Sequence, residues 1–76
     1  MTVNLNINGK NCKLNVERDE EKTFRDAGRL VEDLIKSYHN RFNLMSSEDV
    51  LTRVALDLAV NLVERERELD ELEGVL

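Results

Sequence analysis

The strongest constraint on the fold is a row of mostly apolar residues that runs through positions 51–76 at alternating spacings of four and three. The row consists of Leu51, Ala55, Leu58, Leu62, Arg65, Leu69, Leu72 and Leu76. This alternation is the heptad pattern of a coiled coil, in which apolar residues of two helices interlock. The polar member, Arg65, can fix the register of the paired helices at some cost in stability. We call these eight residues the seam and expect them at a dimer interface.

The composition of this segment changes at residue 63, although no glycine or proline interrupts residues 47–73. Ten of the fourteen residues in 50–63 are apolar, whereas eight of the ten in 64–73 are charged. A helix from residue 47 to near the C-terminus would contain about 30 residues and measure roughly 45 Å. We therefore expect its first half to lie between the chain's own head and a partner chain. The second half is expected to project and to touch only the partner.

Two other interpretations of this helix remain open. An apolar stripe can simply be an intramolecular core, which is the ordinary explanation for residues 50–63 taken alone. The charged stretch 64–76 could instead be disordered, given its density of acidic residues. Against disorder, Arg67 and Glu71 have the i, i+4 spacing that supports a helix. The rest of the chain also leaves no segment to cover the last leucines of the seam.

The N-terminal residues have the pattern of a β-hairpin. Val3, Leu5 and Ile7 alternate with polar residues, which is the period of a half-buried strand. Asn8-Gly9 follows, and this pair favours a two-residue type I′ turn because both central residues need positive φ. We expect a hairpin over residues 2–16.

The two-residue turn also fixes which residues face each other. It pairs Val3 with Leu14, Leu5 with Cys12, and Ile7 with Lys10. The first two pairs form one apolar face, which a lone hairpin would leave uncovered and unstable. We expect a helix to cover that face and Cys12 to be a small core residue rather than a nucleophile.

A first helix is predicted over residues 19–42. Its apolar residues recur at helical spacing, and acidic residues occupy its first turn, where the helix dipole favours them. These apolar residues are Phe24, Ala27, Val31, Leu34, Ile35, Tyr38 and Phe42. The stretch "NLMSSED" then interrupts the helical pattern, and Ser46 or Ser47 can cap the next helix.

Together these elements predict an α+β fold: an N-terminal β-hairpin packed on two helices, the second long and forming a dimeric coiled coil. Residues 1–63 would form a globular head, with the hairpin at 2–16, a helix at 19–42 and the first half of the second helix at 47–63. Residues 64–76 would begin a coiled-coil extension of the same helix.

Length and composition exclude several classes of protein. Seventy-six residues make one small domain with a marginal core, so association is the expected source of additional stability. One cysteine and one histidine supply neither an internal disulfide nor a zinc site. Neither Cys12 nor the solvent-facing His39 belongs to a recognisable catalytic set. We expect no enzyme activity, no cofactor and no metal.

The charge distribution argues against binding to nucleic acids. The net charge is −5, and residues 64–73 contribute −4 of it through six acidic residues and two arginines, which leaves −1 for the rest. No basic stripe appears that could neutralise phosphates. The chain also lacks an apolar run near the roughly 18 residues of a membrane span and a cationic leader. We expect a cytoplasmic protein without membrane insertion.

Four pieces of the sequence resemble the ZapA family of Z-ring-associated cell-division proteins. They are the start "VNLNINGKNCKLNV", the acidic pair Glu20 and Glu21, the small pair Ala27 and Gly28, and the run "VALDLAVNL". The resemblance covers nearly the whole chain. It implies a hairpin and two helices, a homodimer formed through a long C-terminal coiled coil, and the ability of dimers to pair into tetramers.

The resemblance also implies a function without catalysis. Members of the family bind FtsZ, the tubulin-like division GTPase, and cross-link its protofilaments into the ring at midcell. Residues that match the charged contact positions of the family are Lys10, Lys13, Arg41 and Glu48.

The competing interpretation is a structural coiled-coil module that dimerises another small cytoplasmic regulator. Periodicity and spacing agree equally well with both functions, so only the family resemblance favours FtsZ binding. A regulator of nucleic-acid function is disfavoured by the acidic balance.

Overall fold

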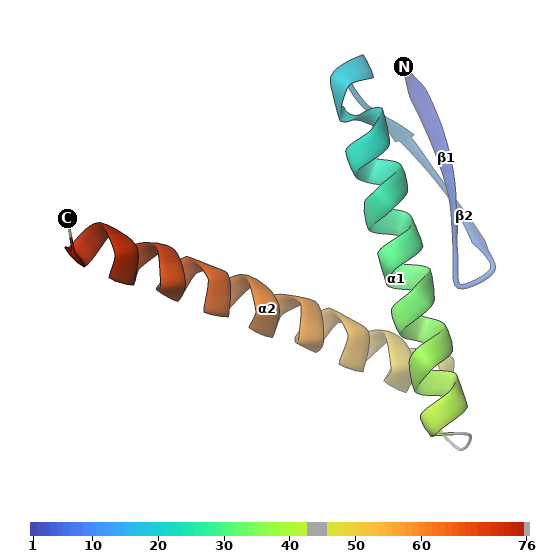
Figure 1. Ribbon diagram of the computed structural model, residues 1–76. Coiled ribbons are helices and arrows are strands. Elements are labelled where there is room, and N and C mark those ends of the chain that lie inside the picture. The colour runs from blue at the N-terminus through green and yellow to red at the C-terminus, as the bar shows by residue number, and fades with distance from the viewer. Residues whose placement is uncertain (43–45, 76) are drawn as a thin grey trace.

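The computed structural model describes residues 1–42 and 46–75, with only the backbone of residue 75 described (Figure 1). Strand β1 (Thr2–Ile7) and strand β2 (Lys10–Asn15) form an antiparallel hairpin. A short 3-10 turn, η1 (Arg18–Glu20), leads into helix α1 (Glu21–Arg41), and helix α2 (Ser47–Val75) follows. This order confirms the expected α+β fold. The helix expected over 19–42 is divided, because its first residues form η1 and Phe42 ends it as the C-cap.

The hairpin has the turn and the register that the sequence predicts. Asn8 and Gly9 have φ angles of 54° and 77°, the positive values that a type I′ turn requires. Val3 pairs with Leu14, Leu5 with Cys12, and Ile7 with Lys10. The ladder is extended by Met1 and Val16, whose backbone groups exchange hydrogen bonds of 2.7 and 2.8 Å.

Helix α1 covers only one strand of the hairpin. Within the described residues it packs against β1 and makes no comparable contact with β2 (Figure 1). Val3 is fully buried, whereas Cys12 is exposed although it shares a face with Leu5. The expectation that Cys12 belongs to the core is therefore wrong for the single chain. Alternation identified the face correctly, but one helix is too narrow to cover both strands.

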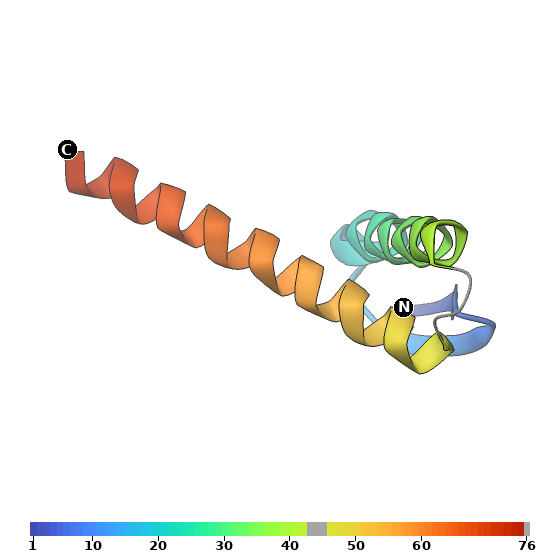
Figure 2. The ribbon, with the colours of Figure 1, turned by 90° about the horizontal axis from the view of Figure 1, so that it is seen from below.

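The main core lies where three segments meet. Ile35 and Tyr38 of α1 pack with Val50 and Val54 of α2, and Ile7 from the end of β1 packs against this cluster. Val31, Leu34 and Leu58 complete it as partly buried neighbours. The hairpin turn, the end of α1 and the start of α2 converge at this cluster (Figure 2). We call this region the junction end of the head.

Helix α2 begins at this junction and diverges from α1, so that the two helices form a V (Figure 1). Ser46 caps it: the Asp49 N–H donates to Ser46 Oγ at 3.1 Å, and the Val50 N–H donates to the Ser46 carbonyl at 3.0 Å. The residues that face the intrachain core, Val50, Val54 and Leu58, recur every four positions. Beyond Leu58 every side chain described on α2 is exposed.

Candidate interaction surfaces

The structure leaves most of the seam uncovered. Leu51, Ala55, Leu62, Arg65, Leu69 and Leu72 are exposed, Leu58 is half-buried, and Leu76 lies outside the described residues. The relative exposures of Leu62, Leu69 and Leu72 are 58%, 59% and 65%. Large apolar side chains this exposed in one helical stripe are typical of an interaction surface.

Leu58 belongs to two packing surfaces at once, which the sequence pattern did not indicate. It belongs to the heptad row, but it also packs against the intrachain core of α1 and α2. At 100° per residue, a row with a constant spacing of four turns gradually around the helix, whereas the seam, with alternating spacings of four and three, stays on one side. The row Val50, Val54 and Leu58 therefore reaches the seam at Leu58. Leu58 thus joins the head core to the exposed stripe.

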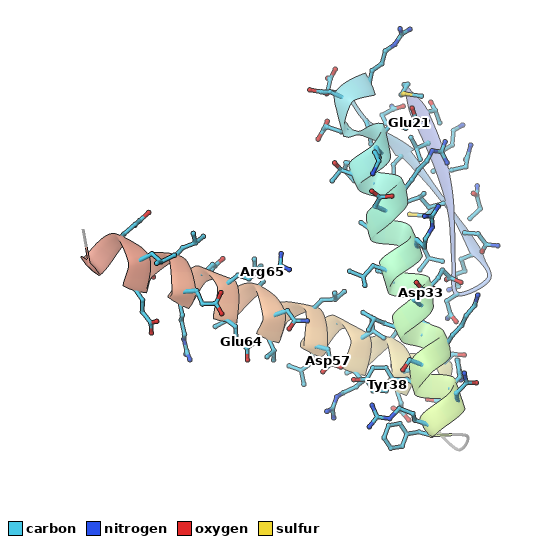
Figure 3. The ribbon with its side chains drawn as sticks, viewed as in Figure 1. Glu21, Asp33, Tyr38, Asp57, Glu64 and Arg65 are labelled. Carbon is cyan, nitrogen blue, oxygen red and sulfur yellow. The ribbon has the colours of Figure 1, made fainter. Side chains whose placement is uncertain are left out.

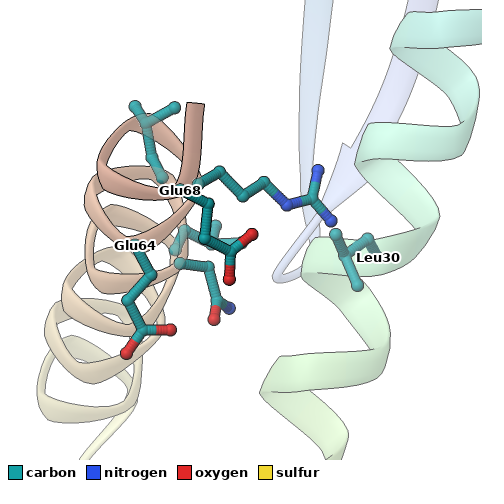
Figure 4. Close-up of a pocket in the computed structure, with 7 residues that line it drawn as sticks. Leu30, Glu64 and Glu68 are labelled. Atoms are coloured by element: carbon teal, nitrogen blue, oxygen red, sulfur yellow. The ribbon is translucent and has the colours of Figure 1, made fainter. Parts of the chain in front are cut away.

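A cleft of about 460 Å³ lies between the two arms of the V. Figure 4 shows Leu30 of α1 on one side of the cleft and Glu64 and Glu68 of α2 on the other. The seam residues Leu58, Leu62 and Arg65 line it as well, and the Arg65 side chain projects into the space between the helices (Figure 3).

The sequence reasoning did not single out Leu30, which lines this cleft and is 52% exposed. A signal for it was present, because Leu30 stands at helical spacing from Ala27 and Leu34 on the flank of the apolar stripe of α1. The cleft therefore extends the apolar surface of the seam from α2 onto α1.

A second apolar surface lies on a different side of α2. Leu56, Ala59, Val60 and Val63 line a shallow hollow of about 360 Å³, together with Glu64 and Arg67. At 100° per residue, Val63 points well away from its neighbour Leu62 in the seam. The first half of α2 is thus apolar on two exposed sides in addition to the side that faces α1.

The four charged candidates do not form one patch. Lys10, Lys13, Arg41 and Glu48 are all exposed. Lys10 pairs with Ile7 and shares its face of the hairpin, whereas Lys13 pairs with Asn4 on the opposite, polar face. Lys10, Arg41 and Glu48 stand on the three segments that converge at the junction end, and Lys13 stands apart from them.

Arg41 is held in place by an aromatic neighbour. Its guanidinium carbon lies 5.5 Å from the centroid of the Phe42 ring, within the range of a cation–π contact. The Phe42 ring is in turn stacked on Tyr38 with 6.1 Å between centroids. Phe42 remains 44% exposed, so the sequence reasoning, which placed it in the apolar row of the first helix, missed its place on the surface.

Among the described residues, an exposed ion pair joins Lys22 and Asp26 of α1. The pKa of Asp26 is lowered because the Lys22 ammonium donates a hydrogen bond of 2.8 Å to its carboxylate, and the charges of Lys22 and Arg29 add to this effect. Both side chains are exposed, and exposed pairs of this kind contribute little to stability. Among the described residues no cluster of three or more His, Cys, Asp and Glu could hold a metal ion.

None of the helices in the described part of the chain is both long and apolar enough to cross a membrane.

Comparisons with known proteins identify relatives over nearly the whole chain. The family model described as "Cell division protein ZapA" matches residues 3–76. The "Cell division protein ZapA" of Mannheimia succiniciproducens is 27% identical over 75 residues, covering 99% of this chain and 70% of that protein. The protein of the same name in Histophilus somni strain 2336 is 23% identical over 74 residues, covering 97% of this chain and 75% of the relative. No solved structure gives a significant match.

The family matched here consists of cell division proteins and is not a known enzyme family. Because its model spans nearly the whole chain, from the first strand through the long second helix, the chain belongs to the ZapA family of cell division proteins.

Proposed function

We propose that this protein is a homodimeric cross-linker that binds FtsZ at the midcell division site in the cytoplasm and joins FtsZ protofilaments to promote and stabilise the Z ring. The observation that carries this proposal is the family match over residues 3–76. No catalytic step is involved in this function.

Dimerisation is supported by the exposed seam. Full burial of a leucine side chain contributes about 1.5–3 kcal/mol, and no described segment of the same chain buries Leu62, Leu69 or Leu72. Pairing two copies along the seam would remove these side chains from water on both chains. The second apolar surface, at Leu56 and Val63, offers a further contact through which two dimers could pair.

Binding to FtsZ is assigned to the head. Lys10, Arg41 and Glu48 at the junction end are the first candidates, with Lys13 on the outer face of the hairpin as a separate one. The contact between Arg41 and Phe42 supports this assignment, because arginine and aromatic side chains are enriched at protein interfaces. A dimer carries two heads, so it can hold two filaments at once.

Co-sedimentation with FtsZ polymers, with light scattering to report bundles, tests the proposal. Wild type should pellet with the polymers and bundle them, and added salt should weaken both effects because exposed charges are screened. The triple variant Lys10→Glu, Lys13→Glu, Arg41→Glu should dimerise but not bind. Leu69→Glu should fail to bundle because its heads separate.

A matched pair of variants separates a specific contact from a general effect of charge. Arg41→Glu and Lys22→Glu make the same change in net charge near opposite ends of α1. Only the first should weaken binding. If wild type never pellets with FtsZ, the alternative of a structural dimerisation module is favoured instead.

A further inference from the structure

The hairpin turn is fastened to α1 by one hydrogen bond between residues far apart in the sequence. The backbone N–H of Asn8 donates to Glu32 Oε1 at 2.6 Å, and both residues are half-buried. The strand ladder ends at the pair Ile7 and Lys10, so the Asn8 N–H lies beyond the paired residues of the hairpin. A hydrogen bond to a carboxylate is roughly twice as strong as one between neutral groups.

The surroundings of Glu32 indicate that holding the turn is its main interaction. Arg29 and Lys36 lie three and four residues away on the same helix and line the same groove beside β1. Such spacing permits ion pairs, yet none of the ion pairs among the described residues includes Glu32. Its carboxylate contacts the backbone of the turn instead.

The position of the turn decides where Lys10 stands. Asn8 and Gly9 lie between Ile7, which packs against the core, and Lys10, which is exposed. A two-stranded hairpin is only marginally stable by itself. The link to α1 therefore fixes the tip of the hairpin relative to Arg41 at the end of the same helix.

We infer that Glu32 is a positioning residue for the partner-binding surface at the junction end: it holds the hairpin turn against α1 and so sets the place of Lys10. This inference rests on the proposed function. Glu32 itself need not touch the partner.

Three variants test the role. Glu32→Ala removes the acceptor, Glu32→Gln keeps an oxygen acceptor but removes the charge, and Asp33→Ala removes the charge of the exposed neighbouring residue as a matched control. In Glu32→Ala the NMR signal of the Asn8 amide proton should move upfield relative to wild type, because the hydrogen bond to the carboxylate is lost. This proton should also exchange with solvent about tenfold faster. Binding to FtsZ polymers should weaken by a similar factor. Glu32→Gln should retain most of the binding, and Asp33→Ala should match wild type in both measurements.

A double-mutant cycle with Lys10→Ala separates positioning from a general loss of stability. If Glu32 acts through the turn, Lys10→Ala should weaken binding less in the Glu32→Ala background than in wild type. Additive effects, or equal binding by Glu32→Ala and Asp33→Ala, would overturn the inference. Failure of wild type to bind FtsZ would overturn the proposed function and this role together. The Asn8 amide would then still report whether the hydrogen bond forms.

Discussion

Gly28 of α1 lies directly against Leu5 of β1: a Cβ atom at residue 28 would be 3.3 Å from Leu5 Cδ1 and 3.5 Å from Cδ2. Residue 28 is buried, so a Cβ atom there would require the Leu5 side chain to shift by a few tenths of an ångström. Without a side chain at this position, α1 packs closely against Leu5.

This contact gives two different expectations for substitutions at residue 28. Gly28→Ala should change stability little, because a gain of up to about 1 kcal/mol in helix propensity is offset by the tight contact with Leu5. Gly28→Val should destabilise by about 1–3 kcal/mol through overpacking. Thermal or urea unfolding measures both. Equal stability of Gly28→Val and wild type would show that the hairpin can move away from α1 without cost.

The turn makes a second prediction about stability. Gly9→Val should destabilise the protein by about 1–2 kcal/mol, because a β-branched residue resists the positive φ observed at this position. Gly9→Asn is the matched control, since asparagine tolerates this conformation. Melting temperatures decide, and an unchanged value for Gly9→Val would contradict the type I′ turn.

The seam is tested by two neighbouring residues on different sides of α2. Leu62→Glu should weaken the dimer strongly, because it places an unpaired charge in an apolar interface. Val63→Glu makes the same change on the second apolar surface and should leave the dimer intact. Sedimentation at tens of micromolar distinguishes monomers from dimers. A monomeric wild type, or a fully dimeric Leu62→Glu, would exclude the seam as the interface.

The opposite faces of the hairpin predict unequal roles for its two lysines. Lys10→Glu should weaken FtsZ binding, because Lys10 is on the segment that reaches the junction end with Arg41. Lys13→Glu should have a smaller effect, because Lys13 is on the other face beside Asn4. Co-sedimentation at low salt compares the two. A larger loss with Lys13→Glu would move the contact to the outer face of the sheet.

The sequence predicted those features that depend on neighbouring residues. Asn8-Gly9 was sufficient for the turn and the register, and Ser46 was among the two residues expected to cap α2. The long helix followed from a segment without glycine or proline. Each of these features depends on local backbone preference and short-range hydrogen bonds, which a sequence pattern reports directly.

Several features that depend on tertiary packing were not predicted. Alternation placed Cys12 on the inner face, but only the position of α1 decides that this part of the face is uncovered. Leu30 was overlooked for the same reason, since the angle between the helices places it in the cleft. The hydrogen bond from Asn8 to Glu32 joins residues 24 positions apart, and no periodicity could indicate it.

Because the two helices form a V, α2 is attached to the core through a short segment near its start, which is the pivot of any tilt of the helix. Val50, Val54 and Leu58 are the residues that attach it to the core, and the helix continues to residue 75. At 1.5 Å per residue the arm beyond Leu58 is about 25 Å long, so a tilt of about 10° at the pivot would move its far end by about 4 Å. In a two-headed linker, the spacing between the bound filaments would then depend on how three aliphatic side chains pack at the junction end of each head.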